Sequence, residues 1–248
     1  MQRERIALRV SKTLRSIGLA VVLMLLLAIA LFTKVDLTPY HQTNFYQKTL
    51  ARKDSLKAQT QTQTQTHTHT LTASWGMATI TPKEPVRLTG KNFKPYQQAF
   101  DSVYVRTFLF DNGMSRVLLI NYDLWIMHPV LADAVRAMIE RQFPGVTGVY
   151  FTANHSHTSI GGWASGLLGE MVVGGNHPET VDFIVDQTRQ AIIQAQQQLD
   201  TVLVGYGEME TKGLVMNRLD VNGQVDNKLR VLKLTNTRNQ SGLFKTYS

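Results

Sequence analysis

The chain has 248 residues, 43% of them hydrophobic, which is enough for one domain with an ordinary core and some additional segments. Its formal net charge of +8 is concentrated at the start, since residues 1–72 hold ten Lys and Arg against three Asp and Glu. The rest of the chain is nearly neutral, which excludes a nucleic-acid-binding domain with basic residues clustered on its folded part. The absence of cysteine excludes a disulfide framework, a cysteine-based zinc site and a thiol nucleophile.

A basic segment, residues 1–15, precedes an uncharged and largely apolar run over residues 16–33. As a helix this run is about 27 Å long, close to the hydrocarbon thickness of a bilayer. We therefore predict a single-pass anchor in the inner (plasma) membrane, with the basic segment in the cytoplasm and the remainder outside it, in the periplasm of a Gram-negative cell. A signal peptide cleaved after Ala28-Ile29-Ala30 is the alternative, but the apolar run continues beyond that point.

Residues 34–72 are predicted to form a stalk followed by a linker rich in Gln and Thr. The stalk carries a weak helical stripe of apolar residues. Residues 59–70 alternate between polar side chains, so neither face of a strand would be buried, and we expect this segment to be disordered. The His67-Thr68-His69 sequence within it imitates a metal motif, but its low-complexity setting argues against metal binding.

The globular domain is predicted over residues 73–248. Two runs typical of strands, at residues 103–110 and 116–122, flank an Asp-Asn-Gly turn and predict a β-hairpin. A helix is predicted from Pro129 to Pro144, followed by a short apolar strand at residues 149–153. Strand, helix and strand at this spacing indicate a βαβ unit, whose two strands should be parallel and buried.

The second half of the domain is predicted to contain one long helix, from Pro178 to about Leu199. Shorter strands are expected at residues 202–205, 213–216, 229–234 and 243–248. The fold class is therefore α/β, with a mixed β-sheet, a βαβ unit and flanking helices. Because the last strand stops without a turn or cap, we expect the domain to be incomplete.

Polar residues follow both strands of the βαβ unit, at the edge where open α/β sheets bind ligands. Asp123 follows the first strand, and His155 and His157 follow the second, so we expect Asp123 to be a catalytic residue beside the histidines. Histidines two apart in an extended segment point the same way, so they can share a metal, or one can ligate it while the other contacts the substrate. Gly161 and Gly162 permit close approach of backbone and leave N–H groups for an oxyanion.

Other interpretations of these residues remain open. The histidine segment can be an inert surface turn, and Asp123 can cap the following helix. His128 and His177 each precede a proline and are expected to be N-cap or surface residues. A different metal site, completed by His177, Glu170 or Asp123, is a further alternative.

The sequence from about Ser74 onward resembles the N-terminal domain of the neutral/alkaline (non-lysosomal) ceramidases. The most specific match is Thr152–Thr158 followed by Gly161-Gly162, which resembles Thr-x-Thr-His-Thr-His-Ser/Thr-x-x-Gly-Gly. Asn154 and Ser156 depart from this pattern in place of threonines, and Ile160 stands where proline is frequent. Four further segments resemble family motifs in the same order: Gly76–Pro82, Asp101–Arg106, Asn121–Leu124 and Val215–Arg218.

The resemblance implies roles for these residues. His155 would be a zinc ligand, and His157 would contact the substrate or the developing oxyanion. Arg218 would hold an oxygen of the substrate or of the released fatty acid, although an exposed arginine is otherwise expected in a surface salt bridge. The backbone of Asn217 would contact the substrate or the oxyanion. Zinc lowers the pKa of a bound water and polarises a carbonyl. The implied reaction cleaves N-acyl sphingosine, so the expected partners are a lipid amide and the lipid bilayer, with no nucleic acid and no assigned protein partner.

The family's remaining zinc ligands, a second histidine, a glutamate and a tyrosine, lie beyond the last residue of this chain. We therefore expect zinc binding to be weak or absent and the fragment to be inactive as a hydrolase. The alternative is a non-enzymatic, membrane-tethered domain that binds lipid or is vestigial.

Overall fold

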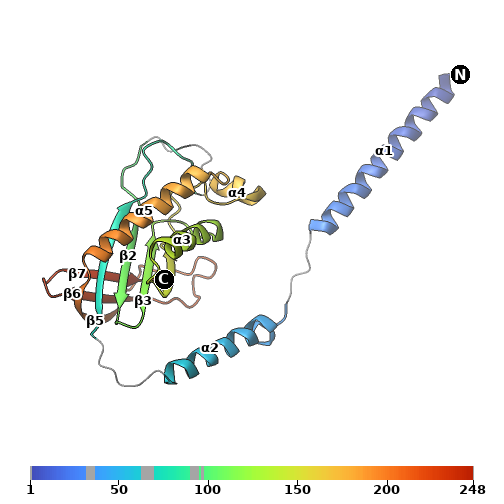
Figure 1. The fold of residues 1–248 in the computed structure, drawn as a ribbon. Coiled ribbons are helices and arrows are strands. Elements are labelled where there is room, and N and C mark those ends of the chain that lie inside the picture. Colours follow the sequence, from blue (N-terminus) through green and yellow to red (C-terminus); the bar gives the residue numbers. More distant parts are fainter. Residues whose placement is uncertain (1, 32–36, 63–69, 90–94, 96–97, 248) are drawn as a thin grey trace. The chain divides into compact units, whose positions relative to one another are not determined.

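The computed structural model describes residues 2–31, 37–62, 70–89, 95 and 98–247 (Figure 1). The chain divides into two compact units, Met1–His67 and Thr68–Ser248. The first unit contains the helices α1 (Gln2–Leu31) and α2 (Asn44–Thr62) and a short 3-10 helix, η1 (Tyr40–Gln42).

Two expectations for the first unit change with the structure. Within the described ranges, no helix is long and apolar enough to cross a membrane, so the anchor predicted over residues 16–33 is not supported. Residues 32 and 33 of that segment lie outside the described residues. The predicted disorder is wrong for residues 59–62, because α2 continues to Thr62 through glutamines, which are good helix formers. The His67-Thr68-His69 sequence lies outside the described residues.

The second unit is built on a seven-stranded mixed sheet with the order β4-β3-β2-β1-β5-β6-β7. Its strands are β1 (Thr72–Thr79), β2 (Tyr104–Asp111), β3 (Arg116–Tyr122), β4 (Gly148–Ala153), β5 (Asp200–Glu210), β6 (Lys228–Asn236) and β7 (Ser241–Thr246). Its helices are α3 (Pro129–Gln142), α4 (Gly166–Val173) and α5 (Pro178–Gln197). Strands β3 and β4 are parallel, and the other neighbouring strands pair antiparallel. The mixed α/β class predicted from the sequence is therefore confirmed.

The β-hairpin and the βαβ unit are also confirmed. Strands β2 and β3 pair from Val105 opposite Tyr122 to Asp111 opposite Arg116. Gly113, with a φ of 81°, forms the turn between them, where a left-handed backbone favours glycine. The expectation that both parallel strands are buried is wrong for β4, because it lies at the sheet edge and leaves Tyr150 64% exposed.

The main core lies between the helices and one face of the sheet. Helix α5 packs along β1 and β2, and α3 packs beside α5 (Figure 1). Both helices contribute buried residues, such as Ile184 and Val135, to the same core cluster as Leu118 and Ile120 of the hairpin. A smaller cluster, formed by Ala73, Phe108, Val202 and Leu234, joins β1 and β2 to the β5–β6–β7 part of the sheet.

The later strands differ from their predicted positions. Residues 213–216 are not a strand but part of the loop between β5 and β6. The Leu214 and Met216 side chains in that loop are exposed, so no described residue buries these apolar groups. Strands β5 and β6 are longer than predicted because they pair with each other over nine positions, from Val202 opposite Asn236 to Glu210 opposite Lys228.

Candidate active site at the ends of strands β3 and β4

The carboxyl ends of the parallel strands bring Asp123 and Asn154 together. The register places Tyr122 opposite Ala153, and the next residue of each strand begins the site. One oxygen of Asp123, Oδ1, accepts hydrogen bonds from Asn154 Nδ2 at 2.8 Å and from Arg106 Nη1 at 2.7 Å. The other, Oδ2, accepts from the Tyr104 backbone N–H at 2.8 Å. Asp123 therefore joins the ends of three elements, and it caps no helix.

His155 is held against the loop that follows β3. It has a φ of 60°, a left-handed conformation in which histidine is enriched among non-glycine residues. Its Nδ1 lies 2.9 Å from the Trp125 carbonyl oxygen, and its Nε2 lies 3.0 Å from the Trp125 indole nitrogen. The neighbouring Ser156 backbone N–H donates to the Leu124 carbonyl at 3.2 Å. These contacts fix the histidine loop to the adjacent strand end.

His157 completes an aromatic cluster with Trp125 and His155. The two imidazole centroids are 5.0 Å apart at an interplanar angle of 77°, and the His157 ring lies 5.2 Å from the Trp125 ring. The two histidines therefore lie side by side, as the sequence predicted. The physical reason differs from the predicted one, because the left-handed His155 is not in an extended segment.

The two glycines of the motif do not present free N–H groups. Gly161 donates its backbone N–H to the Arg87 carbonyl, and Gly162 donates to the Val173 carbonyl, each at 2.7 Å. A Cβ at Gly161 would lie 2.2 Å from the Val173 oxygen, and Gly162 has a φ of 84°. Their glycine character therefore serves close backbone packing, and the expected oxyanion role for both residues is not supported.

Asn217 and Arg218 lie in the loop between β5 and β6. Asn217 Oδ1 accepts hydrogen bonds from the backbone N–H groups of Leu219 and Asp220, so this side chain shapes its own turn. Arg218 is exposed, and no residue in the described part of the chain forms an ion pair with it. Within the same residues, no hydrogen bond joins Arg218 to either histidine.

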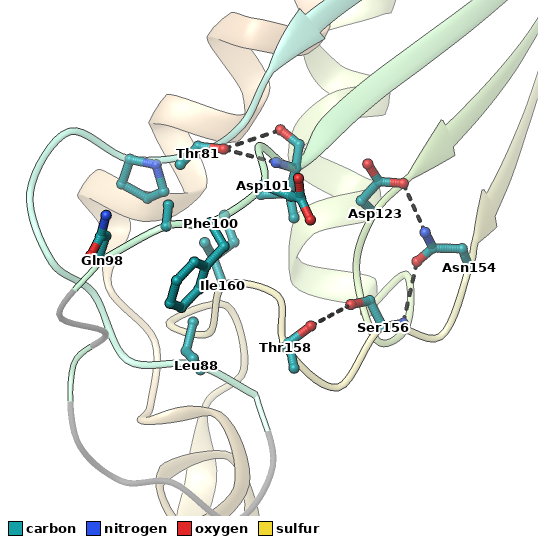
Figure 2. A pocket seen from close by; sticks show the side chains of 13 residues that line it. Thr81, Leu88, Gln98, Phe100, Asp101, Asp123, Asn154, Ser156, Thr158 and Ile160 are labelled. Atoms are coloured by element: carbon teal, nitrogen blue, oxygen red, sulfur yellow. Dashed lines mark hydrogen bonds between the residues drawn. The ribbon is translucent and has the colours of Figure 1, made fainter.

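A cavity of about 550 Å³ lies beside the histidine segment (Figure 2). Asn154, Ser156 and Thr158 line it, whereas the intervening histidines do not. Apolar side chains form much of its remaining wall, among them Leu88, Phe100, Val103 and Ile160. This volume is in the range of small-molecule sites. The cavity was not predicted from the sequence, although Asn154, Ser156 and Thr158 alternate with the histidines along the chain.

The other candidate metal ligands have structural partners of their own. His128 is the N-cap of α3, and its Nδ1 accepts a hydrogen bond from the Val130 N–H, as predicted. His177 is the N-cap residue of α5, but its side chain lies 2.8 Å from the Gly174 oxygen instead of capping the helix. Glu170 forms an ion pair with Arg87.

The alternative metal site, which His177, Glu170 or Asp123 would have completed, is therefore not assembled in the described residues. Across the described residues, no group of three or more His, Cys, Asp or Glu side chains is arranged to hold a metal ion.

The His155 environment suits one ligand of a zinc ion. A metal-binding histidine typically uses one ring nitrogen for the metal and donates the other N–H to a carbonyl or carboxylate. The Trp125 carbonyl supplies that acceptor, so a metal would bind at Nε2 of His155, which lies 3.0 Å from the Trp125 indole nitrogen, and His157 adds a second imidazole nearby. A catalytic zinc normally has three protein ligands. The described residues therefore fit part of such a site and not the whole.

The fold and site define a mixed α/β domain with paired histidines on the loop after a parallel strand. Residues 100–247 match the family model described as neutral/alkaline non-lysosomal ceramidase, N-terminal. The chain therefore belongs to this family, and the resemblance seen in its motifs is confirmed.

Known relatives agree with this assignment. The neutral ceramidase of Pseudomonas aeruginosa is 28% identical over 120 residues, covering 46% of this chain and 18% of that protein. A crystal structure of neutral ceramidase from P. aeruginosa superposes with a TM-score of 0.62 at 20% identity, covering 72% of this chain and 32% of the other. A ceramidase complexed with C2 gives 0.61 at 22% identity, covering 71% and 31%. The chain spans about a third or less of the length of these relatives, and the structural matches show the shared fold.

Proposed function

We propose that this chain provides the paired-histidine part of a zinc-dependent amide hydrolase of the neutral ceramidase type. Such an enzyme cleaves N-acyl sphingosine into sphingosine and a fatty acid. The observation that carries the proposal is the pairing of His155 and His157 at the end of β4, in a chain that belongs to the ceramidase family. Relatives named as neutral ceramidases support the same substrate class.

Each of these residues has a proposed role. His155 would hold zinc through Nε2, with its orientation set by the Trp125 carbonyl. Zinc held there would supply Lewis acidity, which would lower the pKa of a bound water and polarise the amide carbonyl. His157, beside His155, would donate to the developing oxyanion. Arg218 is exposed and is proposed to bind a carboxylate oxygen of the released fatty acid.

The described residues alone are not expected to form a competent catalyst. Two imidazoles lie together, whereas a catalytic zinc site needs three protein ligands and an open position. We therefore expect the purified chain to bind zinc weakly and to hydrolyse no lipid amide.

The cavity favours a second candidate function, which is lipid binding without catalysis. Its wall combines apolar side chains with hydroxyl and amide groups from Ser156, Thr158 and Asn154 and with the carboxylates of Asp101 and Asp123. An apolar cavity with a few convergent polar groups is typical of small-molecule binding sites, and an amphiphile with one acyl chain has matching chemistry. This function would require no metal.

One set of measurements on the purified full chain separates these functions. Zinc titration by calorimetry should show weak binding that His155→Ala abolishes and that His41→Ala, which changes an exposed histidine of the other unit, leaves unchanged. Equal zinc binding by the wild type and His155→Ala would refute the role of His155. Zinc retained through dialysis in a one-to-one ratio, or hydrolysis of a fluorescent short-chain ceramide, would refute the expectation that the chain holds only part of a zinc site. Saturable binding of that ceramide without zinc would favour the lipid-binding function.

A further inference from the structure

Trp125 makes two hydrogen bonds to a single imidazole. Its backbone carbonyl lies 2.9 Å from Nδ1 of His155, and its indole nitrogen lies 3.0 Å from Nε2 of the same ring. The indole also contacts the ring of His157, with centroids 5.2 Å apart. A tryptophan that only filled space would not need both of its polar groups directed at the two nitrogens of one histidine.

Hydrogen-bond chemistry fixes the protonation pattern of this pair. A carbonyl oxygen only accepts, so Nδ1 of His155 must carry the proton. An indole N–H only donates, so Nε2 must present a lone pair. The neutral Nδ1–H tautomer is the one form of His155 that satisfies both bonds. The carbonyl therefore orients the ring, while the indole occupies the nitrogen that remains available.

We propose that Trp125 is a positioning residue that holds His155 as the Nδ1–H tautomer and covers its Nε2 lone pair with the indole N–H. A metal ion or other electrophile that uses Nε2 must first displace the indole. Trp125 thus sets how readily His155 is engaged. The displacement of the indole by a metal rests on the proposed function. The tautomer of His155 and the hydrogen bond from the indole to Nε2 do not.

The backbone and the side chain of Trp125 are held differently, so the indole can leave Nε2 while the carbonyl stays at Nδ1. The backbone is fixed by the neighbouring Leu124, which is fully buried and whose carbonyl accepts from the Ser156 N–H. The Trp125 side chain is only partly buried at the edge of the main core. Rotation of the side chain therefore uncovers Nε2 while the carbonyl continues to orient the ring.

Acylation by diethyl pyrocarbonate tests whether the indole covers Nε2, without a metal or a substrate. The lone pair of a neutral imidazole nitrogen attacks a carbonyl carbon of the reagent, forms the N-carbethoxy imidazole and expels ethyl carbonate. Trp125→Phe keeps the carbonyl and an aromatic ring but removes the N–H. A single hydrogen bond of this kind corresponds to roughly a 2- to 13-fold change in equilibrium. We expect the rate at His155, followed by peptide mass spectrometry, to rise by about that factor. The rate at exposed His41 should not change.

Trp75→Phe is the matched control, since it removes an indole from β1 on the Phe108 side of the sheet. It should leave the His155 rate at the wild-type value. An unchanged acylation rate of His155 in Trp125→Phe, or an equal rise in Trp75→Phe, would contradict the proposal that the Trp125 indole covers Nε2.

Nitrogen NMR of the wild-type full chain tests the tautomer and needs no variant. Long-range proton–nitrogen correlations should assign the His155 proton to Nδ1, and an Nε2–H form would overturn the proposal even where Trp125→Phe fails to fold. Acylation in the presence of zinc chloride tests separately whether a metal displaces the indole. If zinc protects His155 from acylation at a lower concentration in Trp125→Phe than in the wild type, displacement of the indole is supported. If zinc protects neither protein, the displacement of the indole by a metal is overturned while the tautomer and cover stand on the first two measurements.

Discussion

Gly76 lies on β1 directly beneath α5, where the strand and helix backbones meet. An ideal Cβ at this position would lie 2.0 Å from the Ala191 carbonyl oxygen and 2.9 Å from the Ala195 nitrogen. Ordinary carbon–oxygen contacts are about 3.3 Å or longer, so Gly76→Ala requires α5 to move away by roughly 1.3 Å. Both contacts are to helix backbone, which no side-chain rotation can relieve.

The expected cost follows from overpacking. Extra methylene groups in a packed core cost about 1–3 kcal/mol, and a backbone clash belongs at the upper end. Alanine also restricts the unfolded chain, which offsets about 0.4–1 kcal/mol. We expect Gly76→Ala to lower the free energy of unfolding by about 2 kcal/mol, or the melting temperature by roughly 4–8 °C.

Urea unfolding followed by tryptophan fluorescence suits this measurement, because all three tryptophans lie in the second unit. Gly207→Ala on β5 is the control, since no heavy atom lies within 4 Å of its added Cβ. A Gly76→Ala protein within about 0.5 kcal/mol of the wild type would show that α5 does not rest on β1 as described.

Two further predictions concern single polar groups of the sheet. Burial raises the pKa of Tyr122 above its ordinary range, and its hydroxyl bonds Thr188 Oγ1 at 3.0 Å, so Tyr122→Phe should lower the free energy of unfolding by about 0.5–1.5 kcal/mol. A urea curve identical to the wild type would contradict that bond. Hydrogen bonds from the Gly113 N–H and then from Arg116 hold the pKa of Asp111 below its usual value. Its contribution to stability is therefore present above the unfolded pKa of about 3.9 and is lost as pH falls through the lower folded value. Asp111→Asn should reduce the loss of stability below about pH 4, and an unchanged pH profile would refute this.

Local signals in the sequence were enough to predict the elements from β2 to β4. The Asp-Asn-Gly turn defines the β2–β3 hairpin, and Pro129 with the following apolar stripe defines α3. Each of these features is decided by residues close together in the chain. The parallel pairing of β3 and β4 then follows from the length of the connection between them.

Elements that depend on distant residues could not be predicted in the same way. Strand β1 was not identified, because Gly76 interrupts a strand pattern and is explained only by the approach of α5. Residues 213–216 have strand-like composition, but the strand partner that would bury them is absent from the described residues. Helix α4 was also missed, and its Leu167 and Leu168 are 78% and 75% exposed, so no buried stripe marks it.

The site shows the same division. The sequence predicted that His155 and His157 lie close together, although through an extended backbone that His155 does not have. It also predicted that Asp123 meets the residues after β4. The importance of Trp125 could not be predicted, because its contacts depend on the left-handed backbone of His155. The bonding of the Gly161 N–H to the Arg87 carbonyl depends on a segment more than seventy residues away.

The residues after β3 position both faces of the histidine loop. Asp123 accepts the Asn154 side chain on the face that lines the cavity, and Trp125 binds His155 on the other face. The Asp123 carboxylate already accepts from Arg106 and the Tyr104 N–H, and its side chain is only 13% exposed. A carboxylate with these three donors is better suited to holding strand ends together than to transferring a proton. A changed acylation rate of His155 in an Asp123 variant would therefore support a positioning role for Asp123 in place of the predicted catalytic one.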